Sequence, residues 1–169
     1  MNNYMKLEIA AIGENESFAR SAIAAFALAL NPSLTELSDI KTAVSEAVTN
    51  CIVHAYKNGG AENKIFIECR TETQIPVLKT NGKETGETYG ELHIEITDQG
   101  CGIEDVEKAL LPFYTTLESD ERSGMGFTIM QTFMSDFSIQ SERGKGTKIR
   151  MSKKIGVEEN GEIREKVDA

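Results

Sequence analysis

The chain has 169 residues, of which 40% are hydrophobic and 27% are charged, and its formal net charge is −9. This size and balance are typical of one globular domain with a sizeable core. No apolar run approaches the roughly 18 residues of a membrane span, the polar N-terminus lacks a signal-peptide pattern, and the negative charge argues against direct binding to nucleic acid.

The three cysteines, Cys51, Cys69 and Cys101, show no spacing typical of a metal site. Their odd number also argues against a disulfide framework. We therefore expect reduced thiols and a cytoplasmic protein.

The first part of the chain predicts one strand and two helices. Alternation of apolar and polar residues over residues 4–12 is typical of a half-buried strand. A helix then begins near Glu14 and is stopped by Asn31-Pro32. A longer helix begins at the capping box Ser33-x-x-Glu36 and ends before the glycines at 59–60.

The second part predicts four more strands and two short helices. Strand patterns occupy residues 64–71, 92–96, 137–142 and 147–153, and helical patterns occupy 104–110 and 127–134. Residues 72–90 predict an extended hairpin loop with Asn81-Gly82 near its turn. Residues 114–123 predict a flexible loop, and the charged residues 155–169 predict a disordered tail, so we expect one domain over residues 1–154.

The strands alternate on one face only, which indicates that helices cover one side of the sheet while solvent meets the other. Strands and helices do not alternate as regular crossover units. We therefore predict an α+β fold, a two-layer α/β sandwich whose mixed, mostly antiparallel sheet carries its helices on one face.

Two polar residues interrupt the apolar pattern of the second helix. Glu46 and Asn50 are four residues apart and share one helix face with Ala43 and Val53. Burying these two polar side chains is costly unless each has a hydrogen-bond partner. Either the two side chains bond to each other, or a ligand bonds to them. For a ligand, Asn50 offers a neutral oxygen of the kind that Mg²⁺ accepts beside water and phosphate oxygens, while Glu46 can orient an incoming hydroxyl group.

A second candidate binding residue lies at the end of the strand over residues 92–96. Asp98 can accept a hydrogen bond from an exocyclic amine such as that of adenine, while Gly100 and Gly102 let the backbone approach a flat ring. The alternative is an Asp-x-Gly turn that binds nothing.

Glycines also begin the helix near residue 127. Gly124-Met125-Gly126 would let backbone N–H groups and the helix dipole approach a phosphate, and Arg122 just upstream could contact the same group. The alternatives are an ordinary tight turn and an exposed charge. A further glycine turn, Gly144-x-Gly146-Thr147, joins the last two strands.

Together, Glu46-x-x-x-Asn50, Asp98-x-Gly100-x-Gly102, Gly124-x-Gly126 and Gly146-Thr147 resemble the four boxes of the GHKL (Bergerat) ATP-binding fold. Their order and spacing over roughly residues 36–150 make the match specific. Within that superfamily, segments 15–20, 45–50 and 121–130 resemble the sporulation anti-sigma-F factors, a family of serine kinases from spore-forming bacteria.

The resemblance implies ATP and Mg²⁺ as ligands and two linked activities. The protein would bind and silence sporulation sigma factor F, and would phosphorylate a serine of the anti-anti-sigma factor that releases it. It would also form a homodimer. Glu46 would be the general base and Asn50 the magnesium ligand. Asp98 would bind the adenine ring, and Arg122 would contact the γ-phosphate from a lid over residues 114–123.

The residues expected to contact the nucleotide come from all four boxes and from the lid; they are Asn50, Asp98, Gly100, Gly102, Thr115, Thr116, Ser123, Gly124, Met125, Gly126 and Thr147. Two other functions remain open: a stress-response anti-sigma kinase with a different sigma client, and a module that binds ATP without turnover. Glu46 disfavours the second, because a protein without turnover needs no base. Residues 73–89 depart from the family, whose hairpin is tighter.

Overall fold

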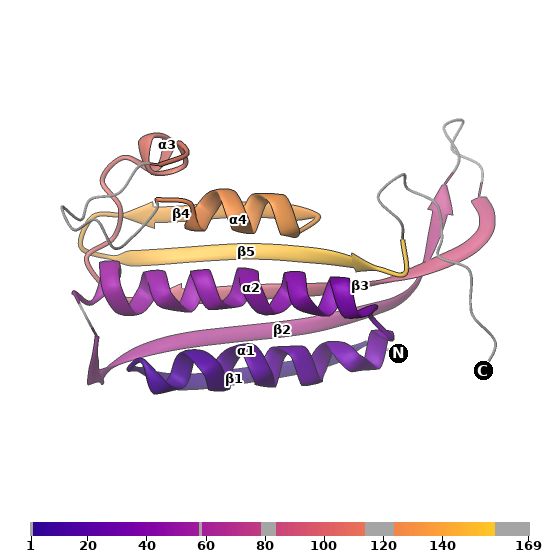
Figure 1. The fold of residues 1–169 in the computed structure, drawn as a ribbon, viewed down its shortest axis with the longest axis horizontal. Helices are drawn as coiled ribbons and strands as arrows, with labels where there is room; N and C mark the ends of the chain where they lie inside the picture. Colours follow the sequence, from indigo (N-terminus) through magenta and orange to yellow (C-terminus); the bar gives the residue numbers. More distant parts are fainter. Residues whose placement is uncertain (1, 58, 79–83, 114–123, 158–169) are drawn as a thin grey trace.

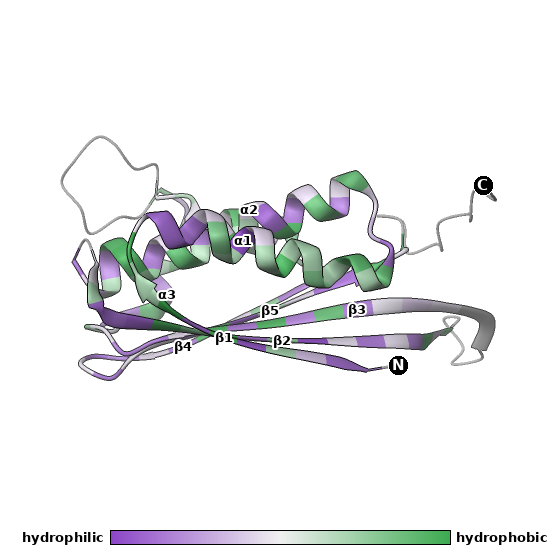
Figure 2. Ribbon diagram, turned by 90° about the horizontal axis from the view of Figure 1, so that it is seen from below, coloured by the Kyte–Doolittle hydropathy of each residue, from purple (hydrophilic) through white to green (hydrophobic). Residues whose placement is uncertain are grey.

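The computed structural model describes residues 2–57, 59–78, 84–113 and 124–157, which form two layers (Figures 1 and 2). The strands are β1 (Asn3–Ala11), β2 (Gly60–Leu78), β3 (Glu84–Asp98), β4 (Asp136–Glu142) and β5 (Gly146–Ile155). The helices are α1 (Glu14–Ala27), α2 (Leu34–Asn50), α3 (Val106–Ala109) and α4 (Gly126–Phe133), with a 3-10 turn η1 (Leu28–Leu30) after α1 and a π-helical turn η2 (Cys51–Ala55) after α2. Within these residues, no helix has the length and apolar character needed to cross a membrane.

The sheet has the strand order β1-β2-β3-β5-β4, and helices α1 and α2 lie over one of its faces (Figure 2). The predicted α+β sandwich is thus confirmed. Every neighbouring pair of described strands is antiparallel, so the parallel pairing that a mixed sheet allows is absent from this part of the chain. Because β5 lies beside β3, the end of β3 at Asp98 meets the start of β5 at Gly146.

The core lies between the sheet and the helices. The strand residues that face α1, α2 and α4 are at most 3% exposed; they include Ile65, Ile67, Cys69, Leu92, Ile94, Ile96, Ile149 and Met151. On the opposite, open face the strands carry cross-strand ion pairs, such as Lys6 with Glu68 and Glu95 with Lys148. This one-sided burial is what the alternating sequence predicted.

Helix α2 begins as the sequence indicated, at a complete capping box. Ser33 Oγ accepts from the Glu36 N–H at 3.1 Å, and Glu36 Oε2 accepts from the Ser33 N–H at 2.5 Å. The helix does not continue unchanged to the glycines, because it widens into η2, where the Tyr56 N–H donates to Cys51 O at 3.1 Å. This widened turn was not predicted.

Strands β2 and β3 extend into the predicted hairpin loop over residues 72–78 and 84–90, so the predicted strand bounds 64–71 and 92–96 were too short. These two strands stay paired beyond Asn3, the first residue of β1, for example at Ile75 with Tyr89 and Pro76 with Thr88. A register shift interrupts the ladder at Gln74, whose φ is 61°. Few apolar residues alternate in this segment, so its sequence resembles a loop. The predicted turn at Asn81-Gly82 lies outside the described residues.

The last strand is longer than the predicted residues 147–153, because β5 runs from Gly146 to Ile155. Ile155, which we assigned to the tail, is the last residue of β5 and is 2% exposed. Its apolar side chain completes the core face of the strand. Residues 158–169 and the predicted lid at 114–123 lie outside the described residues.

Candidate functional site

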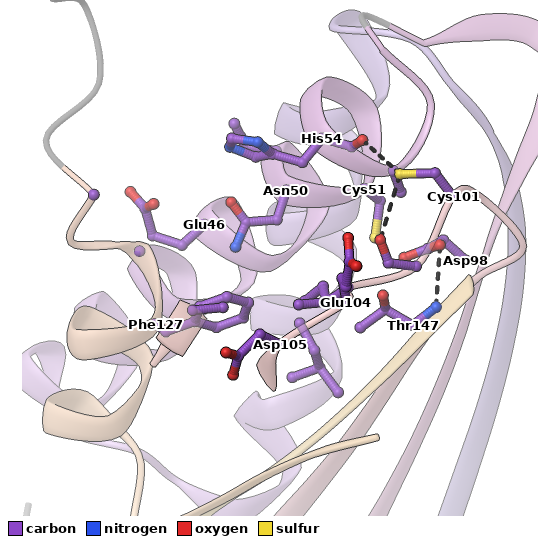
Figure 3. A pocket seen from close by; sticks show the side chains of 18 of the residues that line it. Glu46, Asn50, Cys51, His54, Asp98, Cys101, Glu104, Asp105, Phe127 and Thr147 are labelled. Atoms are coloured by element: carbon purple, nitrogen blue, oxygen red, sulfur yellow. Dashed lines mark hydrogen bonds between the residues drawn. The ribbon is translucent and has the colours of Figure 1, made fainter. Parts of the chain in front are cut away.

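A pocket of about 850 Å³ lies between α2, η2, α3, the start of α4, the end of β3 and the start of β5 (Figure 3). Each of the four sequence motifs contributes residues to its lining. The predicted site residues that line it are Glu46, Asn50, Asp98, Gly102, Gly124, Met125, Gly126 and Thr147. The fold therefore brings together residues that are up to 101 positions apart, from Glu46 to Thr147 (147 minus 46).

Glu46 and Asn50 lie one turn apart on α2, and α4 begins directly opposite them (Figure 3). A Cβ atom at Gly126 would lie 2.9 Å from Glu46 Oε2 and 3.6 Å from Asn50 Oδ1. A side chain at this position would push against the carboxylate. Gly126 thus allows the N-terminus of α4 to approach the two polar side chains closely.

Asp98 ends β3 and is only 3% exposed. Its Oδ1 accepts from the backbone N–H of Gly100 at 2.9 Å and from that of Thr147 at 3.2 Å, and the Cys51 thiol also donates to the carboxylate. Burial raises the pKa of Asp98, and these three donors oppose the rise. The carboxylate is therefore fixed between β3, β5 and η2 while it lines the pocket.

The two glycine turns beside Asp98 are in close contact with other backbone. Gly102 has a φ of 69°, and a Cβ there would lie 2.1 Å from Glu142 O. Gly146 has a φ of 91°, and a Cβ there would lie 2.1 Å from Asp98 O. Both positions therefore require glycine, for the backbone angle and for the space.

Gly100 is placed differently from the other predicted contacts. It lies behind the pocket wall, where a Cβ would come within 2.4 Å of Ala55 O. Its neighbour Cys101 donates its N–H to the same carbonyl at 3.0 Å, and the Cys101 thiol donates to His54 O at 3.3 Å. Turn η2 therefore supports the glycine loop from behind.

The family of the chain is decided by its similarity to known proteins. The sequence profile of the histidine kinase-like ATPase domain matches residues 10–153. The anti-sigma F factor of Caldanaerobacter subterraneus subsp. tengcongensis is 51% identical over 155 residues, which cover 92% of this chain and 96% of that protein. The chain belongs to the anti-sigma F factor family of histidine kinase-like ATPases. The resemblance that the motifs suggested is thus confirmed.

Other relatives agree. The anti-sigma F factor of Clostridium acetobutylicum is 46% identical over 160 residues, covering 95% of this chain and 99% of that protein. The solved RsbU and RsbW domains of Rv1364c from Mycobacterium tuberculosis superpose with a TM-score of 0.57 at 14% identity, over 90% of this chain and 32% of that one. This last likeness supports the fold alone. Membership of the ATPase family makes an ATP-binding domain the coarse functional assignment.

Several pocket residues of this family member were not predicted as part of its site. Cys51, His54, Glu104, Asp105, Lys108 and Phe127 line the pocket. Cys51 follows Asn50 directly, but its helical spacing indicated only a core position. The charged residues belong to α3 and the segment before it, where Asp105 Oδ1 accepts from the Lys108 N–H at 2.9 Å. Nothing in the local sequence of α3 signals that it faces the pocket.

The lid residues stay a prediction. Thr115, Thr116, Arg122 and Ser123 lie outside the described residues. The described chain resumes at Gly124, which lines the pocket and whose carbonyl accepts from the Phe113 N–H at 3.2 Å. The two ends of the predicted lid are therefore held together beside the pocket.

Proposed function

We propose that the chain is an anti-sigma factor and an ATP-dependent protein serine kinase. It binds sporulation sigma factor F and blocks its use by RNA polymerase, and it transfers the γ-phosphate of ATP to a serine of the anti-anti-sigma factor. The relatives named anti-sigma F factor support the first activity. The approach of Gly126 to Glu46 and Asn50, across the pocket from Asp98, is the observation that carries the second.

The pocket suits a purine nucleotide because its two ends differ chemically. At one end Asp98 offers a carboxylate to an exocyclic amine, with Thr147 and Gly102 beside it. At the other end Gly124, Met125 and Gly126 bring the N-terminus of α4, whose N–H groups and dipole favour phosphate. Thr115, Thr116, Ser123 and Arg122 would complete the phosphate end from the lid.

The donor set at the phosphate end fits magnesium. Asn50 supplies an amide oxygen, and among the described residues no group of three or more His, Cys, Asp and Glu side chains could hold a metal ion. Zinc and calcium sites draw more ligands from the protein, whereas Mg²⁺ accepts one or two and takes the rest from water and phosphate. We assign Asn50 as its protein ligand. The bound ion would neutralise charge on the phosphate oxygens.

Glu46 would act on the acceptor serine. Its carboxylate accepts the proton of the serine hydroxyl as the oxygen attacks the γ-phosphorus. The bond from the γ-phosphorus to the bridging oxygen breaks, and ADP leaves with that electron pair. Arg122 would stabilise the charge that develops on the transferred phosphoryl group. The products are phosphoserine and ADP.

A separate protein brings the acceptor, and we propose that the kinase acts as a cytoplasmic homodimer. In this scheme nucleotide and sigma factor binding are linked, so that sigma factor F binds in the presence of nucleotide. The acidic chain itself makes no direct contact with nucleic acid.

The decisive experiment is a phosphorylation assay with Mg-ATP and the anti-anti-sigma factor of the same genome. We expect phosphoserine on the acceptor with the wild type. Glu46→Gln should label about 100-fold or more slowly, because an amide cannot accept the hydroxyl proton. Wild type that binds ATP without labelling the acceptor would overturn the kinase proposal.

A matched substitution separates the role of Glu46 from a general loss of negative charge. Glu107 is exposed on α3 and does not line the pocket. Glu107→Gln should label as fast as the wild type. If both variants label at the wild-type rate, Glu46 is not the base. For the first activity, equal affinity for the sigma factor with and without nucleotide would remove the link between the pocket and that partner.

A further inference from the structure

Tyr56 bridges two segments beside the pocket. It follows η2 directly, and its phenol Oη donates to Lys64 O on β2 at 2.6 Å. The same oxygen accepts from the backbone N–H of Gln99 at 2.7 Å. Gln99 is the residue after Asp98, so the phenol reaches the backbone between the pocket carboxylate and the glycine loop.

The contact with Gln99 is the first of three consecutive attachments. Gly100 packs against the Ala55 backbone, and the Cys101 N–H donates to Ala55 O at 3.0 Å. Ala55 is the last residue of η2, where the carbonyl groups have no further donor within the helix, so its carbonyl is available to the loop. Residues 99–101 are thus held against η2 and Tyr56, and loss of the phenol oxygen alone would break the contact with Gln99.

We infer that Tyr56 is a positioning residue of the nucleotide site, which sets the backbone after Asp98 so that its carboxylate is oriented for a purine with an exocyclic amine. This role rests on the proposed ATP-binding function. Tyr56 does not itself line the pocket, so it acts through Gln99 and Asp98 and touches no substrate.

The phenol is suited to hold this position at neutral pH. Burial is the largest influence on its pKa and raises it. The group therefore stays protonated, and it donates to Lys64 O while it accepts from Gln99. A phenylalanine would keep the ring and lose both hydrogen bonds.

The test is the Tyr56→Phe variant, compared with the wild type for binding of Mg-ATP and for phosphorylation at saturating ATP. We expect ATP affinity to fall about tenfold, because each lost hydrogen bond weakens the preset geometry of Asp98. The rate at saturating ATP should stay within about twofold of the wild type, since Glu46 lies at the other end of the pocket.

Tyr4→Phe is the matched control. The Tyr4 hydroxyl donates to Glu68 Oε2 at 2.9 Å on the open face of the sheet, so the substitution also removes one phenol hydrogen bond. Its ATP affinity should equal that of the wild type. The amount of ATP bound per chain at saturation should be the same for all three proteins, which shows that a weaker affinity does not come from unfolded chain.

Hydrogen exchange of the Gln99 amide gives a readout that does not depend on activity. Without its acceptor, this amide should exchange at least about tenfold faster in nucleotide-free Tyr56→Phe than in the wild type. Unchanged exchange overturns the positioning role even if ATP binding is never detected. If the wild type fails to bind ATP, the proposed function fails. If Tyr56→Phe binds ATP with wild-type affinity, whether or not its rate of phosphorylation is lower, only the positioning role of Tyr56 is overturned.

Discussion

The backbone N–H of Thr147 donates to Oδ1 of Asp98 at 3.2 Å, so β5 fixes the carboxylate that ends β3. A second backbone donor, Gly100, contacts the same oxygen at 2.9 Å. Two backbone N–H groups of the protein therefore already donate to one oxygen of the Asp98 side chain. A substitution that keeps this oxygen and changes the other atom tests ligand recognition separately from folding.

Asp98→Asn is that substitution. Its amide oxygen can accept from both N–H groups, but its NH₂ group presents donors where an exocyclic amine needs an acceptor. We expect ATP to bind about 100-fold more weakly, equivalent to roughly 2.8 kcal/mol, as for the loss of a charged hydrogen bond. Isothermal titration calorimetry measures the affinity, and thermal unfolding without nucleotide should change little.

Asp136→Asn is the control for this prediction. Asp136 lies on β4, where its Oδ2 accepts from Ser152 Oγ at 3.4 Å, away from the pocket. It should bind ATP as the wild type does. Equal ATP affinity in Asp98→Asn and the wild type would remove Asp98 from nucleotide recognition.

The titration of Asp98 predicts how ATP binding depends on pH. Burial raises its pKa above the usual 3.8, so the folded protein takes up the proton more readily than the unfolded chain. The contribution of this group to stability is consequently greatest below 3.8 and is lost as pH rises through the folded pKa. ATP binding has the opposite sign, because the protonated carboxyl group is a poorer acceptor. Affinity should fall on acidification at a pH above 3.8, the ordinary aspartate value.

Asp98→Asn serves as the reference for this titration. The ATP affinities of the wild type and of the variant are measured from about pH 7 downward. Protonation of ATP itself changes both affinities equally, so it cancels in the ratio of the wild-type affinity to the variant affinity. The ratio should shrink as the pH falls toward the raised pKa of Asp98. If this affinity ratio stays constant as the pH falls to 3.8, the role of Asp98 in binding adenine is contradicted.

The sequence predicted those parts of the fold that depend on local chemistry. The capping box of Ser33 and Glu36 placed the start of α2, and alternation placed Ile65, Ile67 and Cys69 in the core, because capping and one-sided burial leave local signals. The same helical spacing placed Glu46 and Asn50 on one face. The pocket follows from these features together with the glycine turns.

The parts that were missed depend on contacts between distant segments. The π-helical turn after Asn50 has no distinct residue preference, and it forms where Ala55 O receives the Cys101 N–H. Tyr56 and Gln99 are 43 positions apart, so their hydrogen bond leaves no mark on either local pattern. The pocket position of Lys108 is equally invisible, because it depends on where α3 lies against the sheet.

Gly126→Ala should impair phosphoryl transfer without destabilising the fold. The added methyl group would lie 2.9 Å from Glu46 Oε2, the mobile end of a side chain, which can move aside. Alanine also favours the helix by up to about 1 kcal/mol relative to glycine. We expect the rate at saturating ATP to fall about 10- to 100-fold as the base is displaced, with a thermal midpoint close to that of the wild type.

Gly13→Ala is the control for Gly126→Ala. Gly13 precedes α1 with a φ of −56°, and a Cβ there would contact nothing within 4 Å. Its rate should match the wild type. If Gly126→Ala phosphorylates equally fast, the start of α4 is not close to the base during the reaction.

Lys153 predicts a stability effect that is independent of the pocket. Its Nζ donates to Asp39 Oδ2 at 2.8 Å and to Phe133 O at 2.6 Å, and its side chain is 15% exposed. Lys153→Met would leave a mostly buried carboxylate and a carbonyl without this donor, so we expect a loss of about 3 kcal/mol in the free energy of unfolding, measured by urea denaturation. Lys145→Met should cost less than about 0.5 kcal/mol, because its ion pair with Glu142 is 70% and 65% exposed. Equal urea midpoints for the two variants would show that the bridge from α2 to β5 and the end of α4 does not stabilise the fold.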